Sequence, residues 1–148
     1  MTPLTEHFAQ EELGVLGTDE RMIENAKTLC EQLLEPIHAH YGHPVRSHCG
    51  YRNPQHNAAV GGKPNSYHLY EEGHAAVDID VIGITLADLF EWLCSASKLP
   101  FDEVILERNS AGIAACVHLQ IDRFNKPRRL GFTGSTGAGT HYTPVTIR

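Results

Sequence analysis

One apolar stretch that carries two carboxylates decides the fold class, Ala75-Ala76-Val77-Asp78-Ile79-Asp80-Val81-Ile82. Side chains along a strand alternate between its two faces, so the apolar residues at the odd positions share one face. Asp78 and Asp80 then share the opposite face. Burying a carboxylate without a partner is costly, so the stretch predicts a strand with a metal ion or another cation against its polar face.

Two amphipathic helices flank this strand in the sequence. The first is predicted from an N-cap at Thr18 to Ile37, because apolar residues recur there at helical spacing. Pro36 favours a kink or an early end of this helix. The second helix is predicted over residues 86–94, with Thr85 as its N-cap.

The remaining segments read as short strands and one short helix. Residues 45–51 predict a strand, and residues 101–107 and 113–121 predict a hairpin. A short helix is predicted between Asn53, which is followed by a proline, and Gly61. Together these elements predict an α+β domain in which helices pack on a small, mainly antiparallel sheet.

The chain shows no internal repeat and no second-domain boundary, so we expect residues 1–148 to form a single domain. Residues 1–17 form a lead-in. Residues 128–148 form a Gly-rich tail, which we expect to be mobile at its tip around residues 134–139.

Charge and composition exclude several classes of protein. Twelve Lys and Arg against eighteen Asp and Glu give a net charge of −6, which argues against a general nucleic-acid binder. No apolar run approaches the length of a membrane span. The start of the chain lacks a basic and apolar leader, so we expect synthesis in the cytoplasm and, for any role outside it, release by another agent. The four cysteines form no C-x-x-C pair, and reduced thiols are expected.

Two histidines complete a ligand set with the Asp78 strand. His118 lies within an apolar strand, and His68 follows Ser66 in a polar loop just before the Asp78 strand. Two imidazoles and one carboxylate leave a fourth position open, an arrangement typical of catalytic rather than structural zinc.

Several ordered motifs resemble one family, the zinc D-Ala-D-Ala carboxypeptidase family of murein peptidases (LAS-type metallopeptidases). They are Ser47-His48-Cys49-Gly50-Tyr51-Arg52, Gly61-Gly62, Ser66-Tyr67-His68, Ala76-Val77-Asp78-Ile79, Phe101-Asp102-Glu103-Val104-Ile105-Leu106-Glu107 and Val117-His118. The resemblance implies a Hedgehog/D-Ala-D-Ala carboxypeptidase-like fold and one zinc ion held by His68, Asp78 and His118. It also implies hydrolysis of peptidoglycan stem peptides or cross-links, as a carboxypeptidase or an endopeptidase. Many members are phage endolysins. The resemblance therefore implies a monomer that acts at the cell wall or periplasm after release, or as part of a virion.

The sequence departs from the family pattern near the first ligand. Nine residues separate His68 from Asp78, where the family has six, and the extra residues fall around residues 70–74. His74 is therefore an alternative first ligand, and Asp80 an alternative second one. Cys49 stands where the family has Ser, and Gln120 where it has Asp or Ser.

The E-x-x-H motif of many relatives does not supply the general base, because Ala115 stands in its glutamate position here, but Glu107 matches the last residue of the motif over residues 101–107. If Glu103 lies opposite His118 in the hairpin, Glu107 lies opposite Ala114 and shares the face of His118. Glu107 is therefore the predicted base and Glu103 the alternative. A slip of one residue would turn Glu107 to the other face.

Four other residues have predicted roles. The guanidinium of Arg52 suits a substrate carboxylate or a developing oxyanion, and the alternative is a structural ion pair. Ser66 is predicted to bind the substrate backbone, with a turn residue as the alternative. Asp102 is predicted to hold a ligand histidine or a loop, and Cys116 to be a buried thiol, with a thiolate near the metal as the alternative. The missing E-x-x-H glutamate keeps a second function open, a catalytically weakened zinc-containing module that binds the cell wall or builds a virion.

Overall fold

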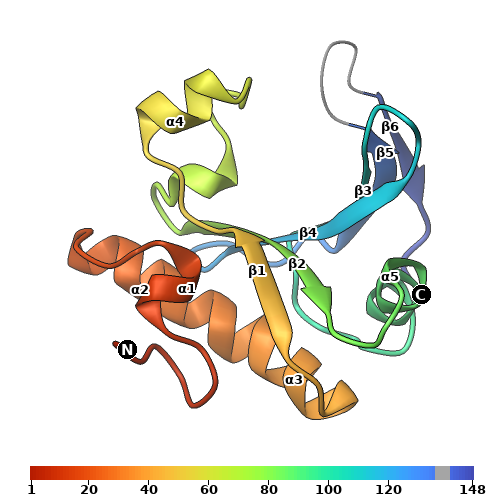
Figure 1. Ribbon diagram of the computed structural model, residues 1–148, viewed down its shortest axis with the longest axis horizontal. Helices are drawn as coiled ribbons and strands as arrows, with labels where there is room; N and C mark the ends of the chain where they lie inside the picture. Colours follow the sequence, from red (N-terminus) through yellow and green to blue (C-terminus); the bar gives the residue numbers. More distant parts are fainter. Residues whose placement is uncertain (136–140) are drawn as a thin grey trace.

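The computed structural model describes residues 1–135 and 141–148 (Figure 1). Its centre is one six-stranded sheet with the strand order β1-β2-β4-β3-β5-β6. All neighbouring strands pair antiparallel except β3 and β5, which are parallel. The predicted α+β fold with a mainly antiparallel sheet is therefore confirmed. The strands are β1 (Val45–Cys49), β2 (His74–Val81), β3 (Glu103–Arg108), β4 (Ala114–Asp122), β5 (Leu130–Ser135) and β6 (His141–Val145).

Helical segments surround this sheet (Figure 1). They are α1 (Gln10–Leu13), α2 (Glu20–Leu29), the π-helical η1 (Cys30–Leu34), α3 (Glu35–Tyr41), α4 (Pro54–Ala59), the 3-10 helix η2 (Tyr67–Leu69) and α5 (Leu86–Cys94). Helix α2 packs on β2, and α5 packs on β2, β3 and β4. No helix among the described residues has the length and apolar character needed to cross a membrane.

The first predicted helix is a continuous run of α2, η1 and α3, and its predicted ends were wrong. Asp19, not Thr18, is the N-cap, because its carboxylate accepts from the Met22 N–H at 2.9 Å. The helix also runs past Pro36 to Tyr41. The wider π-helical turn just before Pro36 accommodates a residue that has no N–H to donate. By contrast, the predicted N-cap at Thr85 is confirmed by its bond to the Asp88 N–H at 3.1 Å.

The two faces of the sheet differ as the alternation predicted. The face against the helices carries fully or nearly fully buried apolar side chains: Ala75, Val77, Ile79, Val81, Val104, Leu106, Val117, Leu119 and Ile121. The opposite face carries Asp78, His118 and Gln120 among others, and these polar groups need partners of their own because they are also largely removed from water.

The tail contributes structure that the sequence did not predict. Strand β5 pairs with β3, and β6 pairs with β5, so residues 130–135 and 141–145 extend the sheet by two strands. Of the tip predicted to be mobile, residues 136–139 lie outside the described part of the chain. The last residue is held by the Arg148 N–H, which donates to the Cys94 carbonyl at 2.8 Å.

The lead-in is fastened to the long helix by one carboxylate. Glu35 accepts from the Thr5 hydroxyl at 2.6 Å and from the His7 N–H at 2.8 Å, and it pairs with His7 Nδ1 at 2.6 Å. The His7 ring stacks on His38 with ring centroids 4.0 Å apart. These bonds satisfy the Glu35 carboxylate from within the chain.

Gly50 marks a close approach between the end of β1 and α1. A Cβ at this position would lie 2.4 Å from the Leu13 carbonyl oxygen, and that oxygen also accepts from the Tyr51 N–H at 2.8 Å. A side chain here would force two backbone segments apart, so only glycine fits without a shift.

We expect Gly50→Ala to lower the free energy of unfolding by about 1–3 kcal/mol through this overpacking. Thermal unfolding followed by circular dichroism measures the change. The matched control is Gly83→Ala, where no atom lies within 4 Å of the added Cβ and only the cost of a positive φ applies. A Gly50→Ala protein that unfolds at the wild-type temperature would contradict the close approach.

Candidate metal and catalytic site

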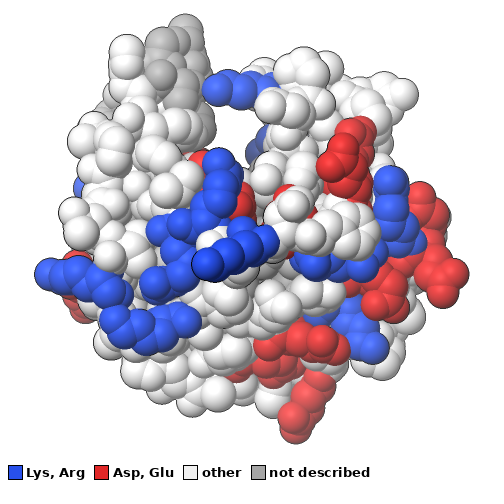
Figure 2. Space-filling view, turned by 180° about the vertical axis from the view of Figure 1, so that it is seen from behind, with Lys and Arg blue, Asp and Glu red and all other residues white. Residues whose placement is uncertain are grey.

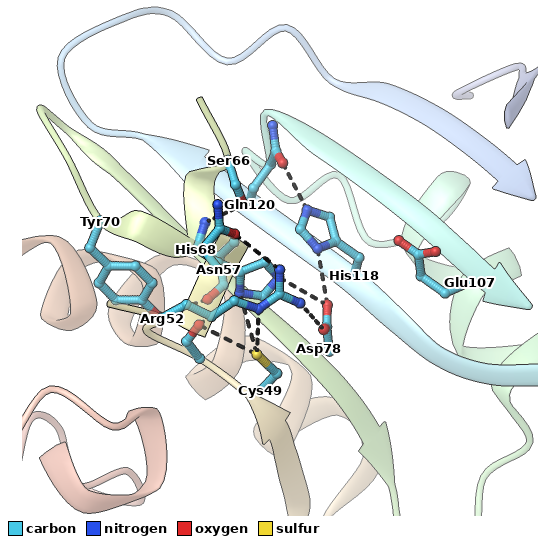
Figure 3. A network of polar contacts seen from close by, with 12 residues as sticks. Cys49, Arg52, Asn57, Ser66, His68, Tyr70, Asp78, Glu107, His118 and Gln120 are labelled. Atoms are coloured by element: carbon cyan, nitrogen blue, oxygen red, sulfur yellow. Dashed lines mark hydrogen bonds and ion pairs between the residues drawn. The ribbon is translucent and has the colours of Figure 1, made fainter. Parts of the chain in front are cut away.

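The three predicted metal ligands meet on the open face of the sheet (Figure 3). Asp78 on β2 lies directly opposite His118 on β4, and His118 Nδ1 is 3.0 Å from Asp78 Oδ1. His68 Nε2, from helix η2, lies 3.4 Å from the same oxygen. The side chains of His68, Asp78 and His118 are only 5, 15 and 10% exposed, so one buried carboxylate oxygen faces two ring nitrogens.

The orientation of His68 is fixed by backbone groups around it. Ser66 caps η2, and its hydroxyl oxygen accepts from the His68 N–H at 3.2 Å. The ring nitrogen Nδ1 lies 2.7 Å from the Gly50 carbonyl oxygen. Because a carbonyl can only accept, this contact places a proton on Nδ1 and directs the lone pair of Nε2 toward Asp78.

The orientation of His118 is fixed by a chain of side chains that ends at an arginine. Arg128 donates two hydrogen bonds of 2.8 Å to the carboxylate of Asp102. Gln120 Nε2 donates to Asp102 at 2.8 Å, and Gln120 Oε1 lies 2.7 Å from His118 Nε2. The ionised carboxylate accepts only, so the amide of Gln120 must present its oxygen to His118. His118 Nε2 therefore carries the proton, and Nδ1 turns its lone pair toward Asp78.

These contacts leave two nitrogen lone pairs and a carboxylate converging on one point. Burial alone would lower the pKa of His68, but its contacts with Asp78 and Cys49 outweigh burial and raise that pKa to about 9. Burial alone would also raise the pKa of Asp78, but the two histidines hold it well below its usual range. The site thus favours a cation, either protons or a metal ion. Two nitrogens and one oxygen suit zinc with an open coordination position.

Glu107 lies beside this cluster, although the predicted register was wrong. Ile105, not Glu103, is opposite His118, and Glu107 is opposite Cys116 rather than Ala114. The shift spans two residues, so Glu107 keeps the face of His118, with its carboxylate turned toward that ring (Figure 3). Burial raises the pKa of Glu107 despite the nearby imidazoles.

A bulge in β4 accounts for the observed register. Arg108 pairs with Ala114 and Glu107 pairs with Cys116, so Ala115 is the extra residue between them. Without this extra residue, Glu107 would lie opposite Ala115 and would face the helices instead of His118. One bulged residue therefore brings the predicted base to the site.

A second bulge brings in a residue whose position the sequence did not predict. Ser47 pairs with Ile79 and Cys49 with Asp78, so His48 is the extra residue in β1. Cys49 Sγ lies 3.9 Å from His68 Nδ1, and it accepts from Arg52 Nε at 3.3 Å. Among the described residues, donor atoms of Cys49, His68 and Asp78 lie within 4.8 Å of one another. The departure from Ser at this position was the one signal in the sequence.

The alternative ligands are engaged elsewhere. His74 stacks on Tyr67 and lies 3.4 Å from Asp122, about 13 Å along the strand from Asp78 at roughly 3.3 Å per residue. Asp80 accepts two hydrogen bonds from Arg46, at 2.8 and 2.7 Å, and lies 3.0 Å from His48.

Arg52 reaches the edge of the cluster. Its Nη2 is 4.0 Å from Asp78 Oδ2, and its Nη1 donates to Asn57 Oδ1 at 3.4 Å. Figure 2 shows the molecule hollowed between the lobe that carries α4 and the sheet end that carries β5 and β6, with acidic atoms visible in the hollow.

Comparison with known proteins identifies the family at this point. The family model of peptidase M15 matches residues 6–114. The chain belongs to the M15 peptidase family. This is a family of zinc metallopeptidases of the D-Ala-D-Ala carboxypeptidase type, and membership implies a peptidase that acts on peptidoglycan peptides. No curated protein sequence matches the chain. The match ends four residues before His118, so the place of His118 in an M15 site rests on the contacts described above.

We expect Gln120→Leu to weaken zinc binding roughly 10–100-fold, because His118 would lose the acceptor that fixes its tautomer and ring orientation. Competition with a chromophoric chelator measures the affinity. Gln32→Leu, at an exposed position of the long helix, is the control and should bind zinc as the wild type does. Wild-type affinity in Gln120→Leu would show that the chain from Arg128 to His118 does not orient the ligand.

Proposed function

We propose that this M15 peptidase holds one zinc ion with His68, Asp78 and His118 and hydrolyses peptide bonds in peptidoglycan stem peptides or cross-links. The observation that carries the proposal is the convergence of His68 Nε2 and His118 Nδ1 on Asp78 Oδ1, at 3.4 and 3.0 Å. Hydrogen bonds of the opposite ring nitrogens to Gly50 and Gln120 support it, because they leave both lone pairs free for a metal.

The proposed chemistry divides between the metal and the chain. Zinc, when bound, supplies Lewis acidity that activates a water and polarises the scissile carbonyl. Glu107 accepts a proton from the attacking water and passes it to the leaving amine. Its burial on the face of His118 supports this role, because a raised pKa suits a group that both takes and gives a proton.

Arg52 and Ser66 are proposed to bind the substrate. Arg52 carries a fixed positive charge beside Asp78, where it suits a peptide carboxylate or the negative charge that develops on the carbonyl oxygen. Ser66 accepts from the His68 N–H, and its own O–H is able to donate to a peptide carbonyl.

Carboxypeptidase and endopeptidase action are both compatible with this proposal, and so is a role as a phage endolysin that acts as a monomer at the cell wall after release. One observation favours a second candidate, a zinc-containing cell-wall or virion module with weakened catalysis. Ala115 replaces the glutamate of E-x-x-H in the bulge of β4. Whether Glu107 on the adjacent strand acts as a base decides between an active peptidase and this module.

Metal content tests the ligand set. We expect His68→Ala, Asp78→Ala and His118→Ala to lose zinc, because each removes one of only three donors. His74→Ala and Asp80→Ala are the controls and should retain one zinc per chain. Elemental analysis of the purified, folded proteins measures this. Loss of zinc in His74→Ala together with its retention in His68→Ala would replace His68 by His74 as the first ligand.

Hydrolysis of purified peptidoglycan tests the base. We expect Glu107→Gln to keep its zinc and to lose about 10²–10⁴-fold in kcat, the usual contribution of general base catalysis. Release of new amino termini measures turnover, with and without a chelator. Glu103→Gln is the matched control, since Glu103 lies opposite Gln120 and 3.5 Å from Arg128. Full activity in Glu107→Gln would remove it as the base. A zinc-loaded wild type without turnover would favour the binding module.

A further inference from the structure

The carboxylate of Glu107 has a partner from the far end of the chain. The hydroxyl of Tyr142 on β6 donates to both carboxylate oxygens, at 3.1 Å each. Tyr142 lies well beyond residues 6–114, the part of the chain that the M15 family model matches. The contact therefore lies in the part of the chain that the family model does not cover.

The sheet register explains how a residue two strands away reaches Glu107. Glu107 pairs with Gly134 on β5, and Gly134 pairs with Tyr142 on β6. Residues paired directly across strands point to the same face, so the three positions form one row. Gly134 has no side chain, and a Cβ there would lie 2.8 Å from Cδ1 of the Tyr142 ring. Gly134 thus leaves open the space through which the Tyr142 side chain reaches the Glu107 carboxylate.

The protonation states of Tyr142 and Glu107 keep the phenol as the donor of this bond and the carboxylate as its acceptor. Burial raises the pKa of Tyr142, and the charge of Glu107 raises it further, so the phenol stays protonated and remains a donor. Burial raises the pKa of Glu107, while the bond from Tyr142 acts in the opposite sense. A donor shared between both oxygens restrains the rotation of the Glu107 carboxylate.

We propose that Tyr142 is a positioning residue that orients the Glu107 carboxylate for proton transfer. This inference rests on the proposed function, because it assigns Tyr142 to the base of the same site. It adds that the catalytic arrangement is completed by the C-terminal strands β5 and β6.

Kinetics of Tyr142→Phe test the proposal first. We expect kcat to fall about tenfold, since a hydrogen bond to a charged group is lost, while KM and zinc content stay within twofold of the wild type. Tyr41→Phe, a tyrosine that packs on Trp92 away from the site, is the matched control and should keep wild-type kcat. Wild-type kcat in Tyr142→Phe overturns the proposal and leaves the proposed function intact.

A double-mutant cycle separates positioning from a structural role. In the Glu107→Gln background, Tyr142→Phe should lower the residual kcat by less than twofold, because the carboxylate it orients is already absent. A full tenfold loss in that background would mean that Tyr142 acts on substrate or on the fold, and would overturn its assignment to Glu107.

A measurement independent of turnover completes the test. Carbon-13 spectra of zinc-loaded protein labelled at glutamate carboxyl carbons report the pKa of Glu107, whose signal is the one missing in Glu107→Gln. We expect a higher pKa in Tyr142→Phe than in the wild type. The other titratable groups that face Glu107 are the same in both proteins: His68, Asp78, Cys116 and His118.

The measured pKa of Glu107 also distinguishes a failure of the role proposed for Tyr142 from a failure of the proposed function. An unchanged pKa overturns the role of Tyr142 even if the enzyme is active. A zinc-loaded wild type that hydrolyses nothing overturns the proposed function, while a raised pKa in Tyr142→Phe still supports the contact with Glu107.

Discussion

The convergence of two imidazole lone pairs on one buried carboxylate oxygen is the constraint around which this protein is arranged. His68 and His118 each direct one ring nitrogen to Asp78 Oδ1 and bind a fixed acceptor with the other. Such an arrangement is unfavourable without a positive charge between the groups. The segments that hold it together come from β1, η2, β2 and β4, so the requirement for a cation links parts of the chain that are distant in sequence.

The sheet separates the demands of folding from those of chemistry. Its helix-covered face carries the apolar residues of β2, β3 and β4, and these supply the hydrophobic stabilisation of the domain. Its other face carries the polar cluster, and the same alternation that buries Val77 and Ile79 presents Asp78. A rigid central strand therefore holds the carboxylate, while the partner histidine on η2 is positioned by a cap and one backbone carbonyl.

Two single-residue bulges determine which side chains of β1 and β3 lie on this face. His48 in β1 and Ala115 in β4 each shift the pairing by one residue, and each brings a reactive side chain to the site. The first places Cys49 opposite Asp78, and the second places Glu107 on the face of His118. Bulges beside a site that re-aim side chains are a known device of antiparallel sheets. The second bulge brings the carboxylate of β3 that we propose as the base to this face, since β4 carries Ala115 at the glutamate position of E-x-x-H.

The sequence by itself determined a strand over residues 75–81 of β2, the helices capped at Thr85 and Asn53, and the residue types of the ligand set. Alternation, capping and ligand chemistry are local properties. Tertiary structure alone decided the pairing register, since a slip of one residue reverses every side chain and a bulge depends on both strands. Tertiary structure also decided that the Gly-rich tail forms two strands of the sheet. Its strand β5 pairs with β3, a contact between residues distant in the chain that no local pattern encodes, and β6 pairs with β5.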